Sequence, residues 1–176
     1  IAKAFQKLKW HWWPSYSAVS ITKRKNKYTR STVDLTYWKK AIHNGVELRP
    51  NCRVIKIVVN KFGKVDGVIY KDHNNKEKLQ KASLIILACN GIGTPRLLLN
   101  SKNKSFPNGL ANNSGLVGKN LMLHPLGYVE GKFDRFLGSS IGPEGCCIFS
   151  HEFYETAHDR NYKRGYTMHV LRGAGP

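Results

Sequence analysis

The stretch of residues 84–101, LIILACNGIGTPRLLLNS, constrains the fold of this chain more than any other part of it. Its unbroken apolar run at 84–88 is typical of a β-strand that is covered on both faces. Two glycines follow within CNGIG and permit a positive φ or a close approach of the backbone. Thr94 is then predicted to cap a helix, with Pro95 at the first helical position.

A buried strand that passes through a glycine turn into a helix start is how α/β proteins hold the phosphates of a nucleotide. The same order of elements also occurs in α/β crossovers that bind no ligand. Taken by itself, the stretch predicts an α/β fold and leaves nucleotide binding open.

A helix is predicted upstream of this stretch. Residues 31–34, STVD, are a variant of the capping box that opens helices. Asn44 and Gly45 form a typical helix stop, and apolar residues recur at helical spacing between these two signals. A short strand is expected directly afterwards, at residues 46–48.

Two further strands are predicted between this helix and the central stretch. Residues 53–59 alternate between polar and apolar as a half-buried strand does, and residues 65–70 return as its partner after a turn at 62–64. A second turn at 72–76 leads through residues 78–82 toward the apolar run. The pattern therefore indicates a β-meander.

The net charge of +18 on 176 residues suggests a nucleic-acid ligand, because basic surface neutralises phosphates. The lysines and arginines are scattered, however, and the densest cluster, residues 23–27, is too short for a convincing binding arm. Nucleic-acid binding is therefore not favoured. A chain of this length suffices for one ordinary domain or parts of two.

Other features narrow the class of protein. No apolar run approaches the roughly 20 residues that a membrane span needs, so no transmembrane segment is expected. The four cysteines lack metal-ligand spacing, and no metal site is predicted. The chain opens on Ile1 and closes on GAGP, so both edges resemble cuts through a longer protein.

Residues 10–15, WHWWPS, concentrate aromatic surface near the start of the chain. One interpretation is a loop that its indole rings pin into a core. The other is an aromatic wall beside a planar cofactor or a sugar, and His11 within it is either structural or a ligand or acid–base group. The basic tract at 22–30 is expected to be an exposed loop.

Several motifs follow one another in a fixed order and spacing. They are STVDLTYW at 31–38, GVEL at 45–48, RV at 53–54, GKVDGV at 63–68, GIGTPRLLL at 91–99, GLVGKNLMLHP at 115–125, FSHEFYET at 149–156 and RGY at 164–166. Together they resemble the glucose–methanol–choline (GMC) oxidoreductases, a family of FAD-dependent alcohol and sugar oxidases and dehydrogenases. The resemblance is strongest to the gluconate- or fructose-dehydrogenase-like branch, of which this chain would be an internal fragment.

The resemblance implies an α/β fold in two incomplete domains. Residues 1–125 would be a partial FAD-binding, Rossmann-like domain with an inserted β-meander. Residues 126–176 would begin an antiparallel-sheet substrate-binding domain, and strands are expected there at 126–133, 146–150 and 166–171.

The resemblance also implies which residues contact FAD. Val54 would bond the adenine edge through its backbone. Ala88, Cys89, Asn90 and Gly91 would lie along the dinucleotide, where small side chains permit close approach. Many family members have Ala-Gly in place of Cys89-Asn90, but asparagine tolerates the left-handed region that such a turn requires.

The implied chemistry is transfer of a hydride equivalent from the CH–OH group of an alcohol, sugar or sugar acid to flavin, with an imidazole as base. No catalytic residue is assigned, because the family places that base beyond Pro176. His124 is interpreted as structural, and His151 and Glu152 are candidates for substrate contact. The electron acceptor is unidentified, and the isolated fragment is expected to bind FAD poorly and to be inactive. The alternative from another class is a non-catalytic basic module that binds nucleic acid or anionic surfaces.

Overall fold

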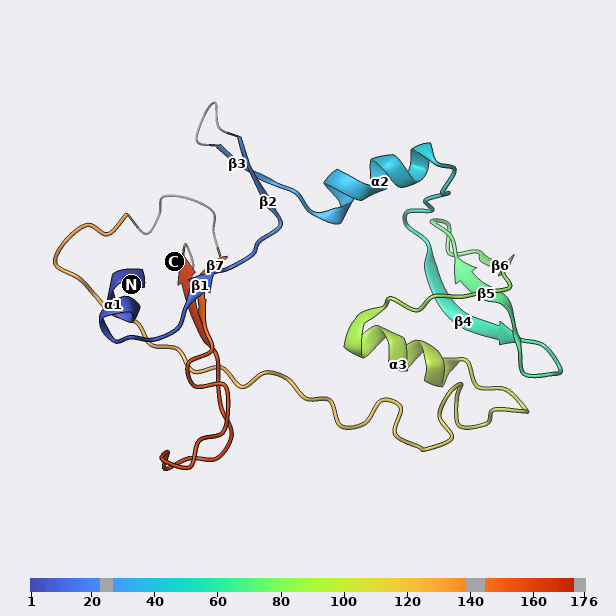
Figure 1. Ribbon diagram of the computed structural model, residues 1–176. Coiled ribbons are helices and arrows are strands. Elements are labelled where there is room, and N and C mark those ends of the chain that lie inside the picture. The colour runs from blue at the N-terminus through green and yellow to red at the C-terminus, as the bar shows by residue number, and fades with distance from the viewer. Residues whose placement is uncertain (23–26, 139–144, 173–176) are drawn as a thin grey trace. The chain divides into compact units, whose positions relative to one another are not determined.

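The computed structural model describes residues 1–22, 27–138 and 145–172. The chain forms two compact units, of which one comprises Ile1–Val46 with Val129–Pro176 and the other comprises Glu47–Tyr128. Figure 1 shows the elements of each unit along the chain. Among the helices of the described ranges, none combines the length and the apolar character that a membrane crossing requires.

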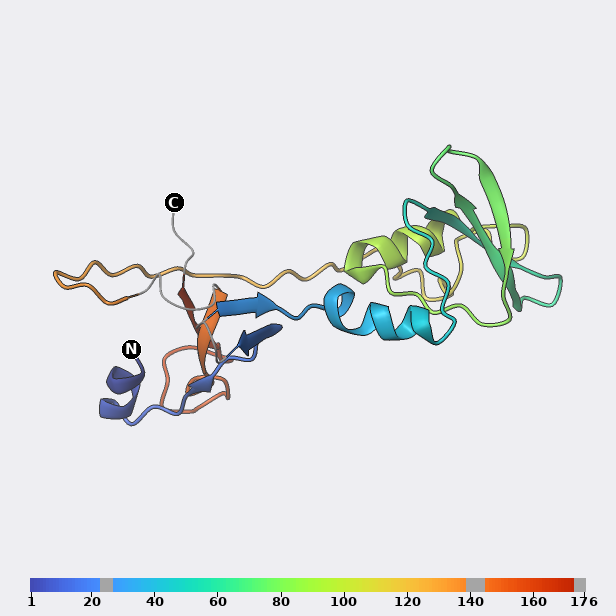
Figure 2. The same ribbon diagram turned by 90° about the horizontal axis from the view of Figure 1, so that it is seen from above.

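The Glu47–Tyr128 unit is built on a three-stranded antiparallel sheet in the order β4-β5-β6. The strands are β4 (Arg53–Val59), β5 (Val65–Lys71) and β6 (Glu77–Lys81), and the helix α3 (Asn90–Asn100) lies against β4 (Figures 1 and 2). The strands predicted at 53–59 and 65–70 are thereby confirmed. Their alternation places apolar side chains on the face toward α3.

The core of this unit lies between that sheet face and α3. Its buried members are Ile57, Leu97 and Leu110. Partly buried apolar side chains surround them, namely those of Val59, Val68, Ile85, Leu87, Leu98 and Phe106.

Ser101 joins the end of α3 to the middle of β4. Its fully buried hydroxyl accepts a hydrogen bond from the backbone N–H of Ile57 at 2.8 Å and donates one to the carbonyl of Leu97 at 2.6 Å. Because β4 is an edge strand of this sheet, the Ile57 N–H would otherwise be buried without a partner.

The apolar run at 84–88 is not the doubly covered strand that its sequence predicts. It has no strand partner in the described ranges, and only Ile85 and Leu87 pack on the core. Leu84 and Ile86 are 75% and 83% exposed. The run is extended, so alternate side chains point to opposite faces, and within this chain only one face finds a surface to cover it.

Asp72 organises the turn that joins β5 to β6, and the turn predicted at 72–76 is confirmed. One carboxylate oxygen of Asp72 accepts hydrogen bonds from the N–H groups of Asn74 and Lys76, and the other lies 2.9 Å from the Lys78 ammonium. Only 7% of the Asp72 side chain is exposed. The hydrogen bond from Lys78, aided by the two backbone donors, lowers the pKa of Asp72 below its ordinary value of 3.8.

The other unit contains more elements, most of which are short. They are α1 (Ala2–Lys7), β1 (Trp13–Pro14), β2 (Val19–Thr22), β3 (Lys27–Arg30), α2 (Val33–His43), β7 (Gly145–Ser150) and β8 (Met168–Arg172). Strands β1, β7 and β8 form an antiparallel sheet in that order, and β2 pairs with β3.

The predictions for this unit are confirmed in part. Strands lie at the positions expected near 146–150 and 166–171, but residues 126–133 form no strand, since no neighbouring edge pairs with them. The prediction of an exposed loop at 22–30 is wrong, because residues 27–30 form β3, which pairs with β2. Residues 23–26 of this tract lie outside the described ranges. Residues 46–48 are not a strand either, as they too have no paired edge.

The predicted helix at 31–44 is confirmed as α2. Gly45 has a φ of +88° and donates to the Ile42 carbonyl, while Val46 donates to Ala41, which is the Schellman arrangement that ends helices. The capping box does not form, because Thr32 makes no side-chain cap; its carbonyl instead accepts a hydrogen bond from the Thr36 hydroxyl. No residue of α2 is buried.

We expect Ser101→Ala to lower the free energy of unfolding by about 1–3 kcal/mol, because the buried Ile57 N–H loses its acceptor. Urea-induced unfolding measures this loss. Ser105→Ala, at an exposed position of the following loop, should change the free energy of unfolding by less than about 0.5 kcal/mol. Equal effects of the two substitutions would contradict the role assigned to Ser101.

The pH dependence of stability should reveal the Asp72 carboxylate. Because its folded-state pKa is lowered, its stabilising contribution is complete above pH 3.8 and is lost as the pH falls through the lowered folded value. We expect the wild type to be more stable than Asp72→Asn by a constant amount near neutral pH. This difference should shrink as the pH falls below 3.8. Urea midpoints measured down to about pH 2 test this, with exposed Asp66→Asn as the control that should show no such advantage.

Candidate functional site

The start of α3 is set by Asn90. Its φ of +59° places it in the left-handed region, and its side-chain oxygen accepts hydrogen bonds from the N–H groups of Ile92 and Gly93 at 3.1 and 3.3 Å. This is the geometry of an N-terminal cap. The prediction that asparagine supports a left-handed turn here is confirmed.

The predicted cap at Thr94 is wrong, and Pro95 lies inside the helix instead of at its first position. Asn90 caps four residues earlier, so the helix is already formed when the chain reaches Thr94. Pro95 removes only the hydrogen bond that would reach back to the Gly91 carbonyl, and this is tolerated so close to the helix start.

This cap bears on anion binding. The exposed N–H groups of a helix start are what hold a phosphate. Here Asn90 already occupies those of Ile92 and Gly93. An anion can therefore use these two donors only where the Asn90 side chain turns aside.

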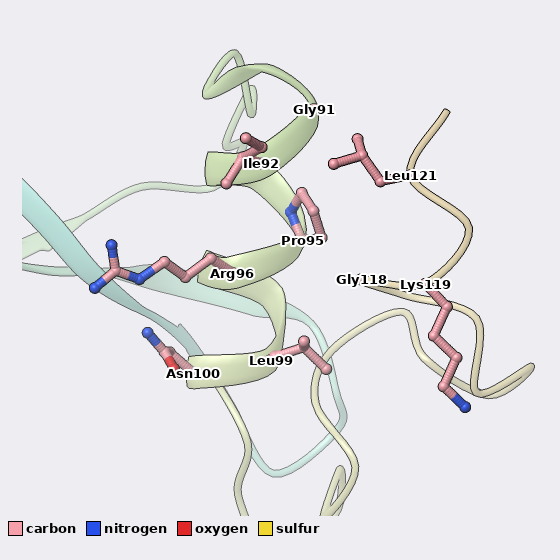
Figure 3. Close-up of a pocket in the computed structure, with 9 residues that line it drawn as sticks. All are labelled: Gly91, Ile92, Pro95, Arg96, Leu99, Asn100, Gly118, Lys119 and Leu121. Atoms are coloured by element: carbon pink, nitrogen blue, oxygen red, sulfur yellow. The ribbon is translucent and has the colours of Figure 1, made fainter. Parts of the chain in front are cut away.

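A cavity of about 340 Å³ lies beside the exposed side of α3 (Figure 3). Its lining comes from α3 and from residues 118–121, namely Gly91, Ile92, Pro95, Arg96, Leu99, Asn100, Gly118, Lys119 and Leu121. Figure 3 shows that the Arg96 and Lys119 side chains point away from each other. Arg96 and Lys119 are the charged residues of this lining, which contains no acidic residue.

Gly118 allows the chain to approach α3 so closely. Its φ is +77°, and a Cβ placed on it would lie 3.0 Å from the Cδ1 atom of Leu99. Any other residue would be strained in its backbone and crowded against the helix. The glycine therefore shapes one wall of the cavity.

The five residues expected to contact FAD all lie in the Glu47–Tyr128 unit. Gly91 lines the cavity, and Ala88, Cys89 and Asn90 are exposed on the segment that enters α3. Val54 is 42% exposed in β4, opposite Tyr70, and is not part of the cavity lining.

A polar cluster lies on the sheet near Val54, and sequence reasoning did not single it out. The Arg49 guanidinium donates to both carboxylate oxygens of Glu47 at 2.7 and 2.9 Å, to the Tyr70 hydroxyl at 3.2 Å and to the Gln80 side chain at 2.7 Å. The hydrogen bond with Arg49 lowers the pKa of Glu47. Only the pairing of β5 with β6 reveals that Tyr70 and Gln80 can share one partner.

A row of aromatic and imidazole rings crosses the sheet of the other unit. Trp13, Phe149 and His169 are register partners on β1, β7 and β8. His151 packs edge-to-face on Trp13 with ring centroids 4.5 Å apart, and His11 lies 5.4 Å from the same indole. The structure thus unites the aromatic tract with His151, two features nearly 140 residues apart.

Glu152 belongs to the same region. Its carboxylate accepts the backbone N–H of His11 at 2.9 Å, and the buried hydroxyl of Ser150 donates to the His11 carbonyl at 2.7 Å. These bonds fix the aromatic tract to the start of the segment after β7. Within the described ranges, no group of histidine, cysteine and acidic side chains could hold a metal ion.

Comparison with known proteins identifies the family. The family model for GMC oxidoreductase matches residues 13–126. The chain is 37% identical to a 2-methyl-1,2-propanediol dehydrogenase of Mycolicibacterium austroafricanum over 99% of its own length and 34% of that protein.

Two further relatives are sugar and aminoglycoside enzymes by name. The chain is 35% identical to the fructose dehydrogenase large subunit of Gluconobacter japonicus over 49% of its length and 16% of that protein. It is 30% identical to a 6'''-hydroxyparomomycin C oxidase of Streptomyces lividus over 75% of its length and 28% of that protein. The chain thus spans about a third or less of each of these relatives.

The family match includes the entry to α3 and the residues that line the cavity beside it. The chain is a member of the GMC oxidoreductase family, and the resemblance found in its motifs is confirmed.

Substitution of Asn90 separates its two roles at the start of α3. Asn90→Ala loses the cap and strains the left-handed backbone, so the free energy of unfolding should fall by about 1–3 kcal/mol. Asn90→Gly loses the cap alone and should cost only a few tenths of a kcal/mol. Urea unfolding of the two variants measures the difference, and an Asn90→Ala variant as stable as Asn90→Gly would contradict the strained position.

Proposed function

We propose that this chain is the FAD-binding middle and the first part of the substrate-binding domain of an FAD-dependent oxidoreductase. The reaction is oxidation of a CH–OH group of an alcohol, sugar or sugar acid. The observation that carries the proposal is the family match over residues 13–126, which spans the glycine-containing entry to α3. The names of the relatives, a diol dehydrogenase, a fructose dehydrogenase subunit and an aminoglycoside oxidase, support the substrate class.

The residues at the entry to α3 suit a dinucleotide. Ala88, Cys89, Asn90 and Gly91 have small side chains, all are exposed, and a Cβ added to Gly91 would meet nothing within 4 Å. The lining of the adjoining cavity includes two basic residues, Arg96 and Lys119, and no carboxylate, which favours the negative charge of a pyrophosphate. These residues would lie along the dinucleotide, and Val54 would meet the adenine edge with its backbone.

The sheet β4-β5-β6 has the chain position expected of a meander inserted in a Rossmann-like domain. It lies between the helix α2 and the extended run at 84–88. In the proposed domain this run becomes a strand once a neighbouring strand pairs with its edge. Residues 1–125 then belong to the FAD-binding domain and residues 126–176 to the substrate-binding domain, and the end of the family match at residue 126 agrees with this boundary.

When bound, the flavin supplies the acceptor for a hydride equivalent from the substrate carbon. The residues of this chain would bind and orient the flavin and the substrate. On the substrate side, His151 and Glu152 lie beside the ring row headed by Trp13, and an aromatic surface with imidazole donors suits a polyol. No residue of the chain is assigned as the catalytic base, and the natural electron acceptor is unidentified.

The full-length protein should carry flavin. We expect visible flavin absorption in the purified protein, and reduction of an artificial electron acceptor when diols or sugars are added. Gly91→Val should weaken FAD binding about tenfold, because a branched side chain forced against a bound ligand costs roughly 1–3 kcal/mol. Fluorescence titration of the flavin-free protein measures the affinity.

Gly127→Val is the matched control, since this glycine also has open space around it and an ordinary φ. Its affinity for FAD should equal that of the wild type. A protein that carries no flavin and shifts nucleic acid in a salt-dependent manner would contradict the proposal and favour the basic binding module.

A further inference from the structure

Both ends of the segment 49–54 are attached to Tyr70. Val54 is the register partner of Tyr70 in the pairing of β4 with β5. The Arg49 guanidinium donates to the Tyr70 hydroxyl at 3.2 Å and lies 5.7 Å from the centre of its ring. The intervening residues therefore form a short loop that is closed on Tyr70.

The Arg49 side chain is held from several directions. Bonds to the two oxygens of Glu47, to Tyr70 and to Gln80 use four of the five N–H groups of its guanidinium. Bidentate contact of this kind fixes the plane of the guanidinium, which a lysine ammonium cannot reproduce. Arg49 therefore ties the segment before β4 to both β5 and β6.

Val54 lies in a short paired segment at the start of β4. The regular pairing of β4 with β5 is interrupted between Val54 and Lys56. On the other side, Asn51 has a φ of +56° in the turn that leads into the strand. Only Arg53 and Val54 of β4 pair with β5 on this side of the bulge, so the loop that Arg49 closes on Tyr70 gives this short paired segment a second attachment.

We infer that Arg49 is a positioning residue for the nucleotide site: it sets the Val54 backbone where the adenosine half of FAD binds. This inference rests on the proposed function. The partners of Arg49 are Glu47, Tyr70 and Gln80, and none of them belongs to the entry to α3. Its loss should therefore affect ligands that contain adenosine and leave the flavin half of the site unchanged.

The experiment uses the full-length protein freed of its flavin, with ADP and FMN as separate probes of the two halves. Arg49→Met should weaken ADP binding about tenfold, as misplacement of one hydrogen-bonding edge would, and leave FMN binding within about twofold of the wild type. Arg49→Lys should behave like Arg49→Met, because the planar guanidinium with its several N–H donors is required, and not the positive charge alone. Isothermal titration calorimetry gives all of these affinities.

Arg53→Met is the matched control, because Arg53 is an exposed arginine at the start of β4. It removes the same charge nearby and should leave both affinities unchanged. Wild-type affinity for ADP in Arg49→Met, or equal losses for ADP and FMN, would overturn the positioning role while FAD binding by the wild type stands. Failure of the wild type to bind FAD or ADP would overturn the proposed function, and the positioning role with it.

Discussion

The hydroxyl of Ser101 joins the two layers of the Glu47–Tyr128 unit. It accepts a hydrogen bond from the N–H of Ile57, which the edge strand β4 leaves free, and donates one to the Leu97 carbonyl near the end of α3. Because Ile57 and Leu97 are also buried core residues, this one hydroxyl fixes the helix over the sheet at the centre of the apolar contact. The position of α3 over β4 is therefore a fixed feature of the unit.

The run at 84–88 is apolar on both faces but is covered on only one of them among the described residues. Ile85 and Leu87 reach the core, but Leu84 and Ile86 remain exposed, and no strand in the described ranges pairs with the run. An exposed apolar face of this kind is normally covered by another part of a protein. The chain spans about a third or less of its relatives in the GMC family.

Two polar clusters show what sheet pairing adds to local sequence. The Arg49 cluster gathers side chains from β5, β6 and the segment before β4, and the ring row gathers Trp13 and His151 from opposite ends of the chain. Neither cluster follows from spacing along the sequence. Each arises because antiparallel register places distant residues on one face of a sheet.

The sequence by itself determined β4, β5, their turns and the end of α2, because alternation, Asn-Gly stops and Asx turns are preferences of the local backbone. It also determined the family, through motifs whose order survives along the chain. Tertiary structure alone decided that the run at 84–88 is covered on one face and that Arg49 meets Tyr70. These outcomes depend on which surfaces and strand edges find partners, and local propensity does not encode that.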